Sequence, residues 1–315
     1  MSELGSTLKP LQRLVAGRGI DGLLVLVALV WGSSYLVAKE LTNHAPIAGI
    51  LAVRFGSAAV LMAAIWAAGR ALGKREAFSK WDLRLGALYG LLVGTIMWIE
   101  TNSIHMTSAT NAGLIISLTI IFTPIIEGVW ARNHLPRIFF VAATGAVVGV
   151  AILVSAGGFA NLNFGDFIML GAAVLRAWTT AAQGKLAVGK QLSSFNVTVI
   201  QFSVVGIGYA LLAPAALGAA VAGFGVQQWL EMAYLVLFCS VFGFVGLMVG
   251  IRRTSATRAS LLLSTEPVWA VVVAAGFGGE ALGWLGALGA AMIIGFSYWG
   301  LSIEASWRQP TPPAQ

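Results

Sequence analysis

The sequence predicts an all-α integral membrane protein of ten transmembrane helices, built as two five-helix repeats of inverted topology with both termini in the cytoplasm. Three observations predict this fold: the composition, the number of apolar segments and an internal repeat. Of 315 residues, 58% are hydrophobic and only 10% are charged, whereas soluble domains carry about 25% charged residues. So few charged side chains cannot cover a protein of this size in water. Soluble enzymes, nucleic-acid-binding modules and secreted disulfide scaffolds are therefore excluded.

The apolar segments are long enough to cross a bilayer. A spanning helix needs roughly 20 mostly apolar residues, and charged or turn-rich gaps divide the chain into ten such segments. Apolar and polar residues do not alternate within them, as they would in the strands of a membrane barrel, so we expect helices. The segments are residues 22–39, 46–69, 84–104, 108–130, 137–156, 165–184, 195–217, 229–250, 256–277 and 282–303.

Basic residues fall on one side of these segments. If the N-terminus is cytoplasmic, sixteen Lys and Arg residues lie in the tails and connections on the cytoplasmic side, and only Lys39 lies on the other. Cytoplasmic loops of membrane proteins are enriched in Lys and Arg, so this division predicts cytoplasmic termini and an even number of spans. It also accounts for the net charge of +7 without a nucleic-acid partner.

The chain repeats itself at an offset of 147 residues. Thr107-Ser108-Ala109-Thr110 matches Thr254-Ser255-Ala256-Thr257, and Arg54-Phe55 falls on Gln201-Phe202. Each copy holds five spans, and this odd number places the second copy upside down in the membrane. Inverted repeats occur in secondary transporters, where a central site opens alternately to either side, so the repeat favours a carrier. We expect a cytoplasmic N-terminal segment (1–21), a first repeat (22–156), a second, inverted repeat (165–303) and a disordered cytoplasmic tail (304–315).

Short motifs occur in several of the predicted spans. They are Trp31-Gly32-Ser33-Ser34-Tyr35, Arg54-Phe55, the openings TSATNAG and TSATRAS, and Glu266-Pro267 followed by Gly279-Glu280-Ala281-Leu282. Together they resemble the EamA-type proteins of the drug/metabolite transporter (DMT) superfamily, and among its branches most resemble the YddG-like bacterial exporters of aromatic amino acids. The resemblance implies an inner-membrane carrier with ten helices and a central cavity between the halves.

Motifs for enzymatic chemistry are missing from the sequence. It contains no Walker A sequence, no HExxH, no CxxC and no Gly-rich dinucleotide turn. The three histidines, His44, His105 and His134, lie at predicted helix ends. We therefore expect no enzyme activity, no cofactor and no bound metal.

Four ionisable side chains fall within the predicted spans: Arg54, Glu100, Arg176 and Glu266. A central charge costs at least about 2.5 kcal/mol to insert into a membrane, so each is a candidate for function or for an internal ion pair. Glu266 is the first candidate for proton coupling or for binding a substrate amine, and a structural ion pair with Arg54 or Arg176 is its alternative. Glu100 and Arg176 lie near mid-span, and we hypothesise that they bind opposite ends of a zwitterion.

Deeply placed aromatic residues are candidates for lining an amphipathic cavity. Trp31, Trp98 and Trp178 lie too far inside the spans for an interfacial belt, and Tyr89 precedes Trp98 on the same predicted helix. Their rings can stack on a flat apolar side chain or cover a cation, and helix packing is the alternative role for each. The polar residues that would complete this cavity are Ser33, Ser34, Asn102, Asn111, Ser117, Ser240 and Ser264.

Proline and glycine indicate kinks and close helix contacts. Pro124 and Pro267 lie within spans and have no N–H, so each frees a backbone carbonyl. That carbonyl can bind a substrate ammonium or simply allow the helix to kink during gating. The glycine stripes 86–94 and 145–149 have the four-residue spacing that lets helices approach closely, either as a moving interface or as a static contact.

These observations favour a secondary membrane transporter. We expect it to export amino acids with aromatic or other apolar side chains, or similar small metabolites, by alternating access through a midplane cavity. A sugar-phosphate or drug carrier of the same superfamily is one alternative, and a channel-like pore is the alternative from another class. The expected partners are the small-molecule substrate and the lipid bilayer, without nucleic acid; proton coupling and the oligomeric state stay open. The expected location is the cell inner membrane.

Overall fold

A computed structural model of the chain describes residues 3–106, 115–131, 135–155, 164–269, 272 and 283–307, and every regular element within these ranges is a helix. The all-helical prediction is therefore confirmed for this part of the chain. The first half holds α1 (Glu3–Thr42), α2 (Ile47–Ala71), α3 (Lys80–Met106), α5 (Thr119–Ala131) and α6 (Arg137–Ser155). The second half holds α7 (Phe164–Leu186), α8 (Ser194–Leu212), α9 (Pro214–Gly223), α10 (Val226–Tyr234), the π-helix η1 (Leu235–Phe242), α11 (Gly243–Arg253), α12 (Ala256–Leu263) and α14 (Trp284–Trp307).

Several of these helices are long and apolar enough to cross a membrane. They are five in number: α2, α8, α14, the Lys80–Ser103 part of α3, and the continuous helix Val226–Arg253 that comprises α10, η1 and α11. Shorter apolar helical stretches occur at Gly19–Ser34, Ile115–Trp130, Arg137–Ile152 and Pro214–Gly223. The count of ten spans and the orientation of the termini stay predictions.

Three helix boundaries differ from the predicted ones. The helix expected over 195–217 ends at Leu212, because Pro214 has no N–H to continue it and instead begins α9. α1 starts at Glu3, so the segment 1–21 runs into the first span as one helix. α14 continues to Trp307, so residues 304–307 are helical rather than part of the tail. The boundary expected near residues 156–165 lies mostly outside the described residues.

Two helices are interrupted at equivalent positions of the two repeats. The chain turns at Leu118, between the helical residues 115–117 and α5. It turns again at Ser264–Thr265, between α12 and the helical residues 266–269. Leu118 and Thr265 are separated by the repeat offset of 147 residues. Irregular backbone at membrane depth is tolerated only against protein or a water-filled cavity, so both turns indicate segments that face the interior of the bundle.

The predicted kink residues lie close to these turns. Pro124 is inside α5, which continues past it, so the interruption comes earlier in the chain than the proline. Pro267 follows the second turn directly after Glu266. The turns, rather than the prolines themselves, are therefore the points where the two helices break.

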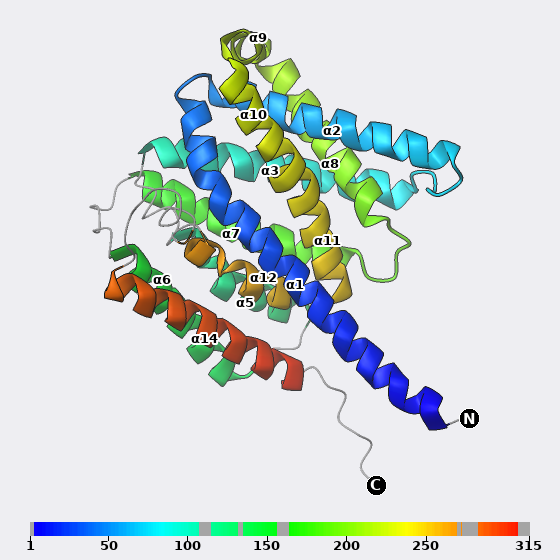
Figure 1. Ribbon diagram of the computed structural model, residues 1–315, viewed down its shortest axis with the longest axis vertical. Helices are drawn as coiled ribbons and strands as arrows, with labels where there is room; N and C mark the ends of the chain where they lie inside the picture. Colours follow the sequence, from blue (N-terminus) through cyan, green and yellow to red (C-terminus); the bar gives the residue numbers. More distant parts are fainter. Residues whose placement is uncertain are drawn as a thin grey trace.

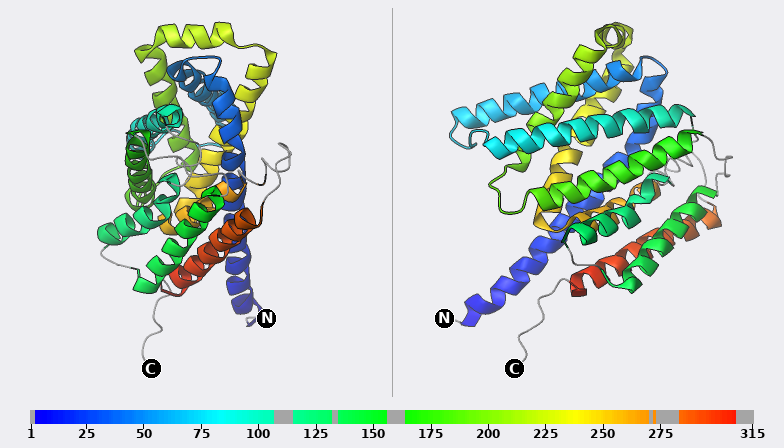
Figure 2. Two further views of the ribbon diagram at one scale, coloured as in Figure 1. Left: turned by 90° about the vertical axis from the view of Figure 1, so that its left-hand side faces the viewer. Right: turned by 180° about the vertical axis from the view of Figure 1, so that it is seen from behind.

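Equivalent helices of the two repeats pack against each other. α2 packs along α8, and α6 packs along α14; the repeat offset carries the sequence of the first member of each pair onto the second. Two equivalent elements in mutual contact lie on a two-fold axis. Other contacts also occur in equivalent pairs. The offset relates α1 to α7 and α3 to the helix that ends with α11, and correspondingly α3 packs on α7 and α11 packs on α1. Figures 1 and 2 show α6 and α14 side by side at one edge, away from α2 and α8, so the halves are interleaved.

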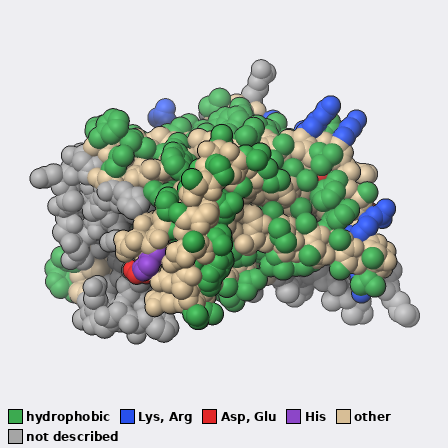
Figure 3. All heavy atoms as spheres, turned by 90° about the horizontal axis from the view of Figure 1, so that it is seen from above, with side chains coloured by type: hydrophobic (Ala, Val, Ile, Leu, Met, Phe, Trp, Pro, Cys, Tyr) green, Lys and Arg blue, Asp and Glu red, His purple; other side chains and the backbone are tan. Residues whose placement is uncertain are grey.

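The start of α1 and the end of α14 lie on the same side of the molecule as the α2–α3 and α7–α8 connections (Figures 1 and 2). Figure 3 shows a face that is mostly apolar, with most of its Lys and Arg side chains gathered toward one end. An apolar surface with the charges at its end is the surface expected of helices surrounded by lipid.

Glycine allows the closest helix contacts. The stripe at 86–94 faces α8, and the stripe at 145–149 faces α14. In α8 itself, a Cβ on Gly206 would lie 2.5 Å from the backbone nitrogen of Gly56 in α2. Because the obstructing atoms belong to a helix backbone, they cannot rotate away.

We expect Gly206→Ala to separate α2 from α8 and to destabilise the protein by roughly 1–3 kcal/mol, the usual cost of overpacking. Gly208→Ala is the matched control, because a Cβ at Gly208 meets no atom within 4 Å. Thermal unfolding of the detergent-solubilised protein measures both variants. Equal melting temperatures for the two would show that the close α2–α8 contact does not contribute to stability.

Candidate functional site

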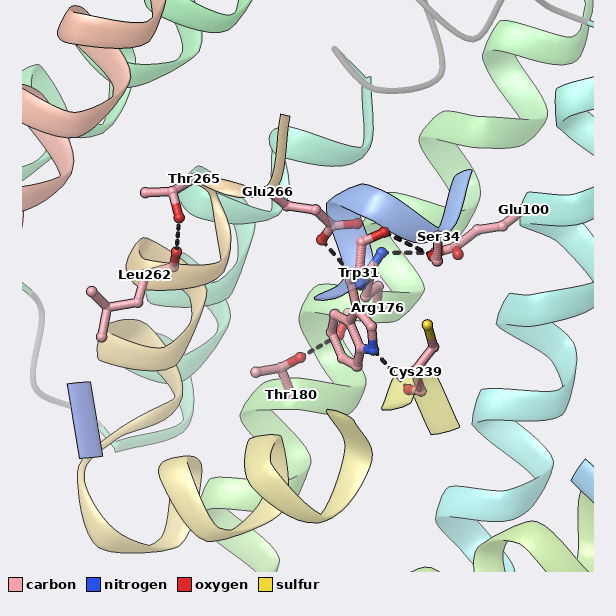
Figure 4. A network of polar contacts seen from close by, with 9 residues as sticks. All are labelled: Trp31, Ser34, Glu100, Arg176, Thr180, Cys239, Leu262, Thr265 and Glu266. Carbon is pink, nitrogen blue, oxygen red and sulfur yellow. Dashed lines mark hydrogen bonds and ion pairs between the residues drawn. The ribbon is translucent and has the colours of Figure 1, made fainter. Parts of the chain in front are cut away.

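Four segments bring charged and aromatic side chains together inside the bundle (Figure 4). α1 supplies Trp31, α3 supplies Glu100, α7 supplies Arg176, and the helical residues after the second turn supply Glu266. All four were candidates from the sequence. We refer to these four residues as the central cluster.

Arg176 is the residue that the other members of the central cluster share. Its Nη1 lies 3.3 Å from Oε1 of Glu100, and its Nη2 lies 3.8 Å from Oε2 of Glu266. The Arg176, Glu100 and Glu266 side chains retain 22%, 15% and 10% of their exposure, so they are largely enclosed but still reachable. Since a charge at membrane depth needs a partner, the two carboxylates stabilise the guanidinium. The ion pair between Glu266 and Arg176 is one of the alternatives that the sequence left open.

Trp31 provides an aromatic surface next to this guanidinium. The Cζ atom of Arg176 lies 5.3 Å from the centroid of the Trp31 ring, within the range of a cation–π interaction. The indole Nε1 donates a hydrogen bond of 2.8 Å to the carbonyl of Cys239, and Phe244 meets the ring edge-on with centroids 5.4 Å apart. The indole is thus fixed on two sides.

A π-helix supplies the surface on which the indole rests. π-helical turns inside α-helices are rare and frequent at functional sites, and η1 lies in the middle of the helix Val226–Arg253. Cys239 lies within η1, and Gly243 is the first residue after η1. A Cβ on Gly243 would lie 2.4 Å from Trp31 Nε1. Ser240 of this segment was a candidate from the sequence, whereas its π-helical form and the role of Gly243 were not predicted. The signal for that role was the spacing of Gly243, Gly246 and Gly250, all of which face α1.

The same π-helix contacts α2 and the C-terminal part of α1. Arg54 of α2, the fourth charged residue predicted within a span, donates through Nε to Ser240 Oγ at 2.8 Å. The hydroxyl groups of Ser33 and Tyr234, the residue preceding η1, hydrogen bond to each other. Arg54 therefore binds a serine in the structure, and the carboxylates of the central cluster pair with Arg176.

The structure does not bring Tyr89, Trp98 and Trp178 into the central cluster. Trp98 precedes Glu100 by two residues, and Trp178 follows Arg176 by two. Two residues correspond to about 200° around a helix, so these rings point away from the charged side chains. Trp98 is 42% exposed. The contacts of the three residues are Tyr209 stacked on Trp98, Trp130 edge-on to Trp178, and the carbonyl of Ala182 accepting from the Tyr89 hydroxyl.

Ser34 contacts the central cluster, because its Oγ donates to the Trp31 carbonyl, whereas most of the other predicted polar residues form hydrogen bonds outside it. Ser117 is 4% exposed, and Asn111 lies outside the described residues. The remaining bonds run from Ser34 Oγ to the Trp31 carbonyl, from Asn102 Nδ2 to the Trp98 carbonyl, from Ser264 Oγ to the Leu261 carbonyl, and between the hydroxyls of Ser264 and Ser297.

A second set of polar contacts fastens the start of α12 to three other helices. Ser255 caps α12 by accepting from the Arg258 N–H at 2.9 Å, the usual role of a serine at this position. The sequence identified this segment as part of the repeat and of a family motif, but it did not predict its partners. They are Glu304 of α14, which accepts from the Ser255 hydroxyl; Glu127 of α5, which accepts from the Thr257 N–H and hydroxyl; and Asp21 of α1, whose two oxygens bind the Arg258 guanidinium.

Across the described ranges, no group of three or more His, Cys, Asp or Glu side chains is arranged to hold a metal ion. The central cluster instead offers one guanidinium, two carboxylates and an aromatic ring. Such groups can bind a small molecule that carries both charges and an apolar part.

We expect Arg258→Asp to lower stability by about 1.5–2 kcal/mol, the lower part of the range for hydrogen bonds to charged groups. The lower part applies because the two side chains retain 24% and 25% of their exposure. Combining this change with Asp21→Arg restores opposite charges and should recover most of the loss, as thermal unfolding would show. A double variant no more stable than Arg258→Asp would mean that the pair does not fasten α12 to α1.

Comparisons with known proteins support a transporter. The model of the EamA-like transporter family matches residues 19–155 and again residues 163–299, so the two matches coincide with the two halves. A "Probable terminal-alkyne amino-acid exporter" of Streptantibioticus cattleyicolor is 27% identical over 276 residues, covering 86% of this chain and 89% of that protein. The "Uncharacterized transporter YyaM" of Bacillus subtilis is 23% identical over 253 residues, covering 77% and 80%.

A protein of known crystal structure has the same fold. It superposes with a TM-score of 0.70 at 18% identity, over 92% of this chain and 99% of its own. The family model covers most of the chain in two consecutive copies. The chain therefore belongs to the EamA-like transporter family, and it is a multi-pass membrane transporter rather than an enzyme.

Proposed function

We propose that the protein is a secondary carrier of the cell inner membrane that exports amino acids with aromatic or other apolar side chains by alternating access. The central cluster is the observation that carries this proposal. It places a guanidinium, two carboxylates and an indole within contact distance of one another. A substrate with the same three chemical parts can satisfy all of them.

An amino acid has these three parts in a compact arrangement. Its carboxylate can take the place of one acidic partner of Arg176, and its ammonium group can bind the carboxylate that is released. Its apolar side chain can then lie against Trp31. Binding in this way exchanges one set of ion pairs for another, so no charge is left unpaired at membrane depth, where an unpaired charge is costly.

The amino-acid exporter among the relatives supports the same substrate class, because its matched region covers most of both chains. Glu266 is our candidate for proton coupling. It lies beside a helix break and faces Arg176 at 3.8 Å, so protonation would release Arg176 from one of its two carboxylates. In the proposed carrier both termini lie in the cytoplasm, and the central cluster lies between the interleaved halves.

Counterflow into proteoliposomes tests the carrier. We expect labelled phenylalanine to accumulate transiently and saturably when unlabelled amino acid is inside. Arg176→Gln, Glu100→Gln and Glu266→Gln should each reduce uptake about tenfold or more, since a hydrogen bond to a charged group is worth about 1.5–3 kcal/mol. Glu40→Gln is the control, because Glu40 lies at an exposed helix end, where it contacts His44 and Asn43. Uptake without saturation or counterflow would indicate a channel-like pore instead.

Competition by analogues that lack one charged group tests the contributions of the substrate carboxylate and ammonium separately. We expect 2-phenylethylamine, which lacks the carboxylate, and 3-phenylpropionate, which lacks the amine, each to compete about tenfold less well than phenylalanine. In Arg176→Gln the advantage of phenylalanine over 2-phenylethylamine should disappear, while its advantage over 3-phenylpropionate persists. An unchanged pattern of competition would mean that Arg176 does not bind the substrate carboxylate.

Gly243→Ala should displace the indole of Trp31 without removing any charge. A cation–π contact is worth about 0.5–1 kcal/mol, so we expect KM for phenylalanine to rise about two- to fivefold while the maximal rate is retained. Gly295→Ala in α14 is the control, because a Cβ there meets no atom within 4 Å. A fall in the maximal rate alone would indicate that Gly243 serves helix motion and not the position of Trp31.

A further inference from the structure

Three cationic side chains surround one indole at an end of the bundle. The ring is that of Trp81, in the first turn of α3. The Nζ atoms of Lys190 and Lys80 lie 4.6 Å and 5.8 Å from its centroid, and the Cζ atom of Arg84 lies 5.6 Å from it. We refer to these four residues as the basic cluster. Lys190 comes from the α7–α8 connection, and the other three come from α3.

The two connections that form the basic cluster are tied together by buried contacts. Asp82 is 2% exposed and accepts hydrogen bonds from the backbone N–H of Ser193 at 3.0 Å and from Nδ2 of Asn196 at 3.2 Å. The Arg75 guanidinium lies 3.6 Å from the ring centroid of Phe195 in α8. These contacts hold Lys190 beside Trp81, so the cations are kept close by the fold.

No carboxylate neutralises these cations within the described part of the chain. The four ion pairs found there include none of them, and the neighbouring acid, Asp82, is turned inward to bind the second connection. Three like charges around one ring repel each other unless an anion lies among them.

An apolar surface continues from the basic cluster along α3. Leu91 follows Arg84 by seven residues, which places it on the same face of the helix, and it is 65% exposed. The start of α3, which carries most of the basic cluster, also lies on the side where α1 begins and α14 ends (Figure 1).

We propose that the basic cluster binds the phosphate group of an anionic phospholipid, whose acyl chain lies along the exposed leucine side of α3. Tryptophan concentrates at the level of lipid headgroups, and basic residues between helices at this level bind anionic headgroups. A soluble phosphate compound would match the charges but would make no use of Leu91. This site is separate from the central cluster and does not depend on the proposed substrate.

Native mass spectrometry of the detergent-solubilised full chain tests the proposal. The protein is titrated with dioleoyl-phosphatidylglycerol or with dioleoyl-phosphatidylcholine. We expect the first phosphatidylglycerol to bind about tenfold more tightly than phosphatidylcholine, and Arg84→Gln combined with Lys190→Gln to weaken it about tenfold or more. Lys74→Gln combined with Arg253→Gln removes the same charge from exposed positions outside the cluster and should change the affinity less than about twofold.

Each other outcome overturns the proposal. An equal loss in both double variants would indicate attraction to a diffuse positive surface rather than to a site. Equal binding of the two lipids would rule out recognition of anionic headgroups. Displacement of phosphatidylglycerol by an equimolar amount of inorganic phosphate or glycerol 3-phosphate would assign the site to a soluble anion. Melting temperatures of both double variants establish that each is folded, and Lys190→Arg should retain the lipid.

Discussion

A guanidinium at membrane depth is tolerable only when carboxylates face it, and this constraint organises the centre of the molecule. Arg176 on α7 draws Glu100 from α3 and Glu266 from the segment after the second turn. Trp31 of α1 lies against the same group. Four segments from both halves of the chain therefore meet at one side chain. Removing that charge would leave two buried carboxylates facing each other, which is costlier than the pairs it now makes.

The backbone around this centre is irregular at the places where side chains need access to it. The second turn releases residues 266–269 from the axis of α12 and lets Glu266 face α7. η1 provides the carbonyl that binds the Trp31 indole and the serine that binds Arg54. Regular α-helices would direct their carbonyls along the helix axis, so these departures from helical geometry are what place polar groups inside an otherwise apolar bundle.

The sequence predicted much of the fold because lipid imposes simple rules. Composition and segment length identify membrane helices, and the cost of an intramembrane charge is enough to single out Glu100, Arg176 and Glu266. It did not predict which aromatic rings join them. Helices in lipid are apolar all round, so their periodicity does not show which face turns inward. Trp98 and Trp178 were therefore cavity candidates with helix packing as the alternative, and in the structure they pack against Tyr209 and Trp130.

Other features required the tertiary structure because they arise from contacts between distant segments. Thr257 and Glu127 are neighbours only because α5 crosses α12. The basic cluster exists because Asp82 ties α3 to the α7–α8 connection. No local sequence pattern predicts such pairings. The glycine spacing of α11 is an exception, because its glycines all face α1.

The scaffold is symmetric while the site is not, and this contrast bears on the proposed transport cycle. Equivalent helices pack in equivalent pairs, so two packings of the halves can be close in energy, as alternating access requires. None of the three charged residues, however, has a charged counterpart in the other repeat. The positions 147 residues away from Glu100, Arg176 and Glu266 are Leu247, Leu29 and Thr119, respectively. The charged groups are therefore present once, not twice. A symmetric frame around a single set of charges can expose the same site to either side while holding a zwitterionic substrate in one orientation.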